Sequence, residues 1–124
     1  MDSEIYNLIN TEYNFISIAD KEAIKKLRIS TAIYNGEILN KLTFSYIYEF
    51  IVKDLWKKYK EQILMSDKFN KNIKLKGSFG SCCVVDLSDG YELYINLSAK
   101  YLINNIKNFL QEFPNNELLL KFEI

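Results

Sequence analysis

The chain has 124 residues, of which 48% are hydrophobic and 15% aromatic, and its 16 basic and 16 acidic residues cancel to zero net charge. With this much apolar material, a chain of this length can build a core without disulfides or metal ions and is not disordered. Zero net charge argues against a general polyanion binder, because nucleic-acid affinity depends largely on an excess of Lys and Arg. We therefore expect one domain spanning residues 1–124.

Three helices are expected in the first half of the chain. Ser3 can cap the first helix, and Asp20 can cap a second that ends at about residue 28. The third and clearest covers about residues 43–64, where the apolar stripe is so broad that the helix must be covered on more than one side. Its apolar positions at helical spacing are Phe44, Ile47, Tyr48, Ile51, Val52, Leu55, Tyr59 and Ile63.

The segment IYNGEIL between the second and third helices has two interpretations. A helix could end at Asn35-Gly36, since Gly often follows the last helical residue. Alternatively, Asn-Gly is the preferred pair of a two-residue β-hairpin loop, which would pair Ile33 with Ile38. We favour the hairpin.

The second half of the chain predicts the element order β-β-α-β. Alternating apolar residues indicate strands over residues 73–87 and 91–97, and Ser98 can cap a helix that ends at Pro114. Residues 117–122 predict a last strand. The expected fold is therefore an α+β domain with N-terminal helices, a long central helix and one small, mostly antiparallel sheet.

The turn between the two predicted strands fixes their register. A two-residue loop would place Val85 opposite Tyr94 and mix the apolar and polar faces. A three-residue loop, Ser88-Asp89-Gly90, places Val85 opposite Leu93 and keeps the apolar faces together. Because a slip of one residue turns every side chain to the other face, we predict the three-residue loop with Gly90 in a left-handed conformation.

The predicted register argues against a catalytic role for the cysteines. Cys82 and Cys83 are neighbours on a strand, so their side chains point to opposite faces, and Cys83 belongs to the apolar one. The chain has no histidine, which excludes a Cys-His nucleophile and any His-containing zinc site within it. Gly77 and Gly80 lack the Gly-Lys-Ser/Thr ending of a phosphate loop and predict a bulge or bend in a long strand. We therefore expect that the protein is not an enzyme and binds neither a metal ion nor a cofactor.

The carboxylates of the predicted hairpin are more informative. Asp86 lies directly opposite Glu92, and Asp89 lies in the turn between them. Facing like charges are destabilising. Four explanations are open: screening by water at a wet hairpin tip, a lysine of the same chain, an acidic patch for a basic partner, or a metal or acid-base pair.

Our first functional hypothesis is a small non-catalytic protein-binding module, such as an inhibitor or an immunity protein. Its acidic hairpin would neutralise a toxin, a nuclease or another macromolecular partner by imitating a polyanion. The expected partner-binding residues are Asp86, Asp89, Tyr91, Glu92 and Tyr94. The N-terminus lacks a secretory signal and no stretch is long and apolar enough to span a membrane, so a cytoplasmic bacterial or phage protein is expected.

The alternative hypothesis is a nucleic-acid-associated regulatory protein. Residues 53–76 contain eight lysines against three acidic residues, which is the strongest local excess of positive charge in the chain. Such binding would weaken steeply with salt. The residues expected to carry it are Lys53, Lys57, Lys60, Lys74 and Lys76.

Overall fold

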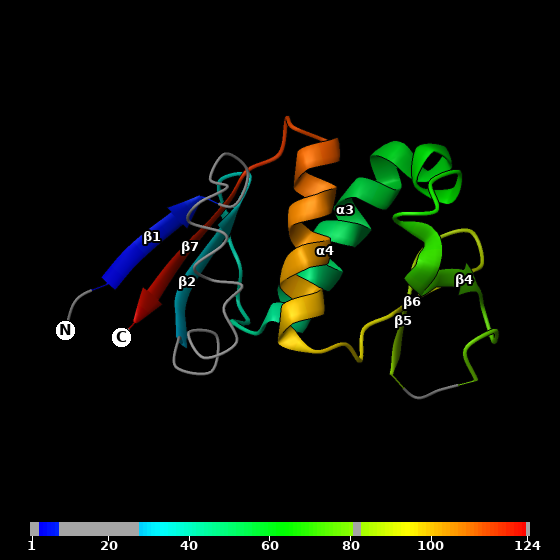
Figure 1. Cartoon of the computed structure of the whole chain (residues 1–124), viewed down its shortest axis with the longest axis horizontal. Coiled ribbons are helices and arrows are strands. Elements are labelled where there is room, and N and C mark those ends of the chain that lie inside the picture. Colours follow the sequence, from blue (N-terminus) through cyan, green and yellow to red (C-terminus); the bar gives the residue numbers. More distant parts are fainter. Residues whose placement is uncertain (1–2, 8–27, 81–82, 124) are drawn as a thin grey trace.

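The computed structural model of the chain describes residues 3–7, 28–80 and 83–123. It confirms the α+β class and arranges the elements in three layers, with two helices between two antiparallel sheets (Figure 1). The first sheet has the order β1-β7-β2-β3 and contains β1 (Ser3–Asn7), β2 (Arg28–Tyr34), β3 (Glu37–Ile38) and β7 (Leu118–Glu123). The second has the order β4-β6-β5 and contains β4 (Ile73–Leu75), β5 (Val84–Asp86) and β6 (Tyr91–Tyr94). The helices are α3 (Phe44–Leu64), α4 (Ala99–Glu112) and the short 3-10 helix η1 (Asn70–Asn72).

The long central helix is confirmed. Its first turn is capped by Thr43, whose hydroxyl accepts a hydrogen bond from the backbone N–H of Tyr46 at 3.2 Å. Aromatic pairs attach α3 to both sheets and to the other helix. Phe50 lies 5.9 Å from Tyr34 of β2, Trp56 lies 5.2 Å from Tyr91 of β6, and Tyr48 lies 6.3 Å from Phe109 of α4, measured between ring centroids. The buried residues of α3 are Ile47, Tyr48, Ile51, Val52, Leu55, Trp56 and Ile63.

Helix α4 also begins where the sequence predicts. The Oγ atom of Ser98 accepts a hydrogen bond from the backbone N–H of Tyr101 at 3.4 Å. One stripe of the helix is buried against α3 and the loop after it, where Phe69 lies 4.5 Å from Phe109 between ring centroids. That stripe consists of Leu102, Ile103, Ile106, Phe109 and Leu110.

Both predicted hairpins are present. Ile33 pairs with Ile38, and Asn35 and Gly36 have φ angles of 49° and 84°, which a two-residue loop of type I′ requires. In the second hairpin the pairs Val85–Leu93 and Asp86–Glu92 confirm the three-residue loop. Gly90 is left-handed as predicted, with a φ of 80°, and Asp89 also has a positive φ of 62°.

Two predictions about the N-terminal region and the last strand need correction. The helix expected to begin at Ser3 is wrong over Ser3–Asn7, which form strand β1. The helix expected from Asp20 falls on residues outside the described part, and Arg28 already belongs to β2. The single sheet is also wrong, because β7 pairs with β1 and β2 and not with the second hairpin.

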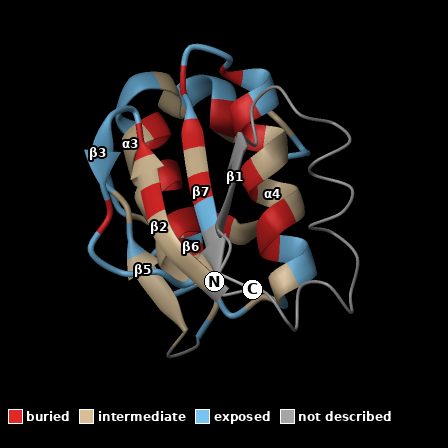
Figure 2. Ribbon diagram, turned by 90° about the vertical axis from the view of Figure 1, so that its left-hand side faces the viewer, coloured by how far each residue is buried: buried red, intermediate tan, exposed pale blue. Residues whose placement is uncertain are grey.

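The pairing of β7 follows from burial. Leu118 and Leu120 of β7 are fully buried, as are Ala32 and Tyr34 of β2, whereas Leu119 between the two leucines is half-buried. Figure 2 shows this alternation of buried and less buried positions along both strands. The two strands therefore present one continuous apolar face to the helix layer, which the second hairpin could not reach.

The long strand expected over residues 73–87 is also wrong. Residues 73–75 and 84–86 form separate strands on opposite sides of β6. Gly77 and Gly80 lie between them with φ angles of 92° and 56°, in the left-handed region that extended strands do not use. The two glycines therefore belong to a connecting loop and do not form a bulge or bend within one strand.

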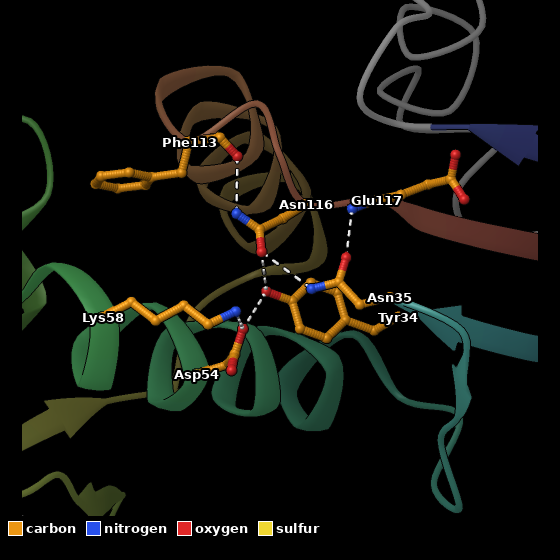
Figure 3. A network of polar contacts seen from close by, with 7 residues as sticks. All are labelled: Tyr34, Asn35, Asp54, Lys58, Phe113, Asn116 and Glu117. Carbon is orange, nitrogen blue, oxygen red and sulfur yellow. Dashed lines mark hydrogen bonds and ion pairs between the residues drawn. The ribbon is translucent and has the colours of Figure 1, made fainter.

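A network of polar contacts joins the first hairpin to the end of α4 and the start of β7 (Figure 3). The side chain of Asn35 accepts a hydrogen bond from the backbone N–H of Glu117 at 2.7 Å, and its amide donates to Oδ1 of Asn116 at 3.0 Å. Asn116 is 3% exposed and donates to the carbonyl oxygen of Phe113 at 2.9 Å. The amide of Asn116 thus holds three chain segments together.

The same network contains a buried phenol. The hydroxyl of Tyr34 donates a hydrogen bond to Oδ2 of Asp54 at 2.7 Å, and Lys58 donates to the same oxygen at 3.1 Å. Burial, followed by the hydrogen bond to Asp54, raises the pKa of Tyr34 above its ordinary value of 10.0. Burial also raises the pKa of Tyr48, to about 12.

We expect replacement of Asn116 by alanine to lower the free energy of unfolding by about 2 to 3 kcal/mol, because buried polar partners lose their hydrogen bonds. Urea denaturation followed by circular dichroism measures this change. The neighbouring exposed Asn115 supplies a matched control, and Asn115→Ala should change the free energy by no more than about 0.5 kcal/mol. Equal effects of the two substitutions would contradict the role of Asn116.

We expect alkaline pH to destabilise the fold through its buried phenols. Between the ordinary pKa of 10.0 and the folded pKa of about 12, Tyr48 ionises in the unfolded chain and stays protonated in the folded one. The unfolded state then binds fewer protons, so stability falls as pH rises through this window, by up to about 1.4 kcal/mol per pH unit. Urea denaturation as a function of pH should show a smaller slope for Tyr48→Phe. Tyr101→Phe, at a site 65% exposed, should leave the slope unchanged.

Candidate functional site

The turn of the second hairpin, residues 88–90, is attached to α3. Nε1 of Trp56 donates a hydrogen bond to Oγ of Ser88 at 2.8 Å. Nζ of Lys60 forms an ion pair with Oδ2 of Asp89 at 2.8 Å and lies 5.9 Å from the ring centroid of Trp56 and 5.8 Å from that of Tyr91. The hydrogen bond to Asp89 raises the pKa of Lys60. The turn is therefore held on the helix by one neutral and one charged contact.

The two facing carboxylates have very different surroundings. The side chain of Asp86 is 68% exposed, and its nearest basic group is Nζ of Lys76 at 3.7 Å, which is also 68% exposed. Glu92 is only 4% exposed, and its Oε1 accepts hydrogen bonds from the backbone N–H groups of Gly77 at 3.1 Å and Phe79 at 3.4 Å. Amides of the β4–β5 loop thus compensate the buried charge of Glu92.

Four explanations were open for the three carboxylates of this hairpin. For Asp86 and Asp89, the structure favours the second, a lysine of the same chain. Lys60 pairs with Asp89, and Lys76 approaches Asp86. Glu92 instead accepts hydrogen bonds from backbone amides, which is none of the four explanations. The contact between Lys76 and Asp86 is long and exposed at both ends, so it contributes little to stability and can be exchanged for a contact with another molecule.

The β4–β5 loop also covers Tyr94. The ring of Phe79 stacks on Tyr94 with 5.3 Å between centroids, and Nζ of Lys74 lies 5.3 Å from the centroid of Phe79. Tyr91 is on the other face of β6, against Trp56. The expected partner-binding residues therefore do not share one exposed surface. Asp86 and Asp89 are exposed, Tyr91 and Tyr94 are half-buried on opposite faces, and Glu92 is buried.

The five lysines of the nucleic-acid hypothesis are partly neutralised within the chain. Lys53 pairs with Glu49 at 2.7 Å, and Lys60 and Lys76 have the acidic partners described above. Among the residues that the structure describes, Lys57 and Lys74 have no carboxylate within ion-pair distance. The positive charge of residues 53–76 is thus partly balanced by contacts inside the fold.

One pocket brings parts of both predicted sites together. It has a volume of about 170 Å³ and lies between α3 and the second hairpin; we call it the hairpin pocket. Trp56, Leu87 and the methylene chains of two lysines give it an apolar interior, and charged groups of both signs stand around it. Its lining residues are Lys53, Trp56, Lys57, Asp86, Leu87 and Ser88.

Sequence reasoning missed this pocket because its walls come from segments about thirty residues apart. Trp56 beside the apolar stripe of α3, and the predicted turn at residues 88–90, were the available signals. Neither signal shows that the indole N–H reaches the Ser88 hydroxyl, which is the contact that brings the two walls together.

The structure describes one of the two cysteines, Cys83. Cys83 is half-buried, and its carbonyl oxygen accepts a hydrogen bond from the backbone N–H of Ile95 at 3.1 Å, in agreement with the predicted register. Cys82 lies outside the described residues. Over residues 3–7, 28–80 and 83–123, no cluster of three or more Cys, Asp or Glu is placed to hold a metal ion. No helix in the same ranges is long and apolar enough to cross a membrane.

The chain was compared with protein-family models, with curated proteins and with solved structures. No match was found in any of the three comparisons.

We expect Glu92→Ala to lower the free energy of unfolding by about 2 kcal/mol, because two loop amides lose their acceptor. Hydrogen exchange followed by NMR should show faster exchange at the amides of Gly77 and Phe79. Asp86→Ala removes the facing carboxylate at an exposed position and should change stability by no more than about 0.5 kcal/mol. Unchanged exchange at Gly77 in Glu92→Ala would contradict the proposed contact.

Proposed function

We propose that the chain is a small non-catalytic protein-binding module of the inhibitor or immunity type, which contacts its partner at the hairpin pocket. The observation that carries this proposal is an apolar pocket of about 170 Å³ with lysines on one wall and Asp86 on the other. A cavity of roughly 150 Å³ can accept a benzene ring. The hairpin pocket therefore offers room for one apolar side chain of a partner.

The charges around the pocket define the chemistry of the expected partner. Lys57 has no carboxylate partner in the described part of the chain and can pair with an acidic residue of the partner. Among the described residues, the one basic group near Asp86 is Lys76, at the long distance given above, so Asp86 can pair with a basic residue of the partner. The partner is thus expected to present an apolar side chain between one acidic and one basic residue.

Rigidity of the pocket supports a binding role. The indole of Trp56 is 1% exposed and is fixed by its hydrogen bond to Ser88, while Lys60 holds Asp89 from the adjacent turn of α3. Walls that are already ordered lose little conformational entropy when a partner binds. An inhibitor or immunity protein acts by binding alone, because it blocks the functional site of its partner without catalysing a reaction. An ordered binding surface is therefore sufficient for this role.

This proposal refines the hypothesis of an acidic hairpin surface. Glu92 is buried and Asp89 is engaged by Lys60, so Asp86 is the carboxylate best placed to contact a partner. The nucleic-acid alternative receives less support, since three of its five lysines have acidic neighbours. A salt titration with labelled oligonucleotides tests that alternative directly.

The proposal can be tested by site-specific photo-crosslinking. A photoreactive amino acid at Lys53, which lines the pocket and leaves the contact between Trp56 and Ser88 intact, should yield a covalent adduct with one protein in an extract of the native host. With the partner then purified, titration should change the fluorescence of Trp56, the only tryptophan of the chain. Lys57→Glu and Asp86→Lys should each weaken binding by about tenfold.

Matched controls distinguish the pocket from the general surface. The same photoreactive group at Lys100, an exposed position at the start of α4, should give no adduct, and Lys100→Glu should leave affinity unchanged. Adducts of equal yield from both positions, or an affinity insensitive to Lys57→Glu and Asp86→Lys, would overturn the proposal. Tight, salt-sensitive binding of oligonucleotides without a protein adduct would favour the alternative.

A further inference from the structure

A second pocket lies at the C-terminal ends of the two helices and shares no lining residue with the hairpin pocket. It has a volume of about 390 Å³, and we call it the helix-end pocket. Three aromatic rings, one carboxylate and several neutral polar side chains contribute to its lining. The lining residues include Tyr59, Phe69, Phe113, Glu112, Gln62 and Ser66.

The aromatic residues form a continuous cluster. The rings of Tyr59 and Phe113 stack with 4.4 Å between centroids and an interplanar angle of 13°. The ring centroid of Phe69 lies 6.1 Å from that of Phe113. The backbone of α3 departs from helical geometry at Tyr59, the residue whose side chain joins this cluster. Aromatic faces carry negative charge density and attract organic cations.

The electrostatics of the pocket also favour a cation. Figure 1 shows that α3 and α4 run in the same general direction, so their C-terminal ends lie at the same end of the helix layer. A helix C-terminus carries a partial negative charge, and neither helix has a basic residue in its last turn. Glu112, the last residue of α4, is exposed and adds a full negative charge.

The chain itself shows that a cation can lie against this cluster. Nζ of Lys68 is 5.7 Å from the ring centroid of Phe69, within the range of a cation–π contact. The side chain of Lys68 is exposed and does not line the pocket.

We propose that the helix-end pocket binds an organic cation, either an alkylammonium or a guanidinium group. The aromatic cluster contacts the cation, and Glu112 supplies the opposite charge. Two sources share this chemistry: a free quaternary ammonium compound and the Arg side chain of a polypeptide. This site does not depend on the protein-binding role proposed for the hairpin pocket.

NMR titration of the full chain tests the proposal at constant ionic strength. Tetramethylammonium represents the free cation and N-acetyl-arginine amide the peptide side chain. Either probe should shift the ring resonances of Tyr59 and Phe113, and the tighter of the two identifies the source. Glu112→Gln should weaken binding about two- to fivefold, and Lys68→Met should strengthen it by a similar factor, because a positive charge next to Phe69 is removed.

Glu117→Gln provides the matched control, since Glu117 is an exposed carboxylate that does not line the pocket. It should leave the affinity for both probes unchanged. The neutral isostere tert-butanol should bind more weakly than tetramethylammonium. Equal binding of tert-butanol, equal affinities of wild type, Glu112→Gln and Lys68→Met, or no shift of either ring would overturn the proposal.

Discussion

Helix α3 carries apolar side chains around most of its circumference, and no single neighbouring element can cover them. Phe50 contacts the first sheet, Tyr48 contacts α4, and Trp56 contacts the second sheet. Burial of large aromatic groups is among the strongest contributions to folding. The three-layer arrangement therefore follows from the need to remove this helix from water on three sides, and the hairpin pocket lies at the seam between two of these layers.

Features set by neighbouring residues could be predicted from the sequence. Thr43 and Ser98 cap the helices that follow them, and the loop ending at Gly90 has the predicted length. Each of these features depends on chemistry within a few residues. At a cap, a hydroxyl accepts a hydrogen bond from the backbone N–H three positions later, and in the hairpin, the register keeps apolar side chains on one face. The breadth of the apolar stripe of α3 also indicated correctly that more than one layer would cover it.

Features set by distant residues could not be predicted. Alternation along β7 shows which face is buried but not which strand lies beside it, so its pairing with β2 was missed. The burial of Glu92 depends on amides of Gly77 and Phe79, which reach it because the loop folds back over β6. The pairing of Asp86 with Glu92 was predicted correctly, but the burial of Glu92 depends on this distant loop.

The position of β7 has a consequence for how the chain acquires its structure. β7 is the last strand in sequence but an interior strand of the first sheet, between β1 and β2. During synthesis, β1 and β2 leave the ribosome well before the strand that joins them, since residues 118–123 follow both helices and the second sheet. Pairs such as Ile33–Leu119 are separated by most of the chain, and contacts of that kind slow folding. The helices and the second sheet can therefore form first during translation, and the sheet that contains β7 is completed last.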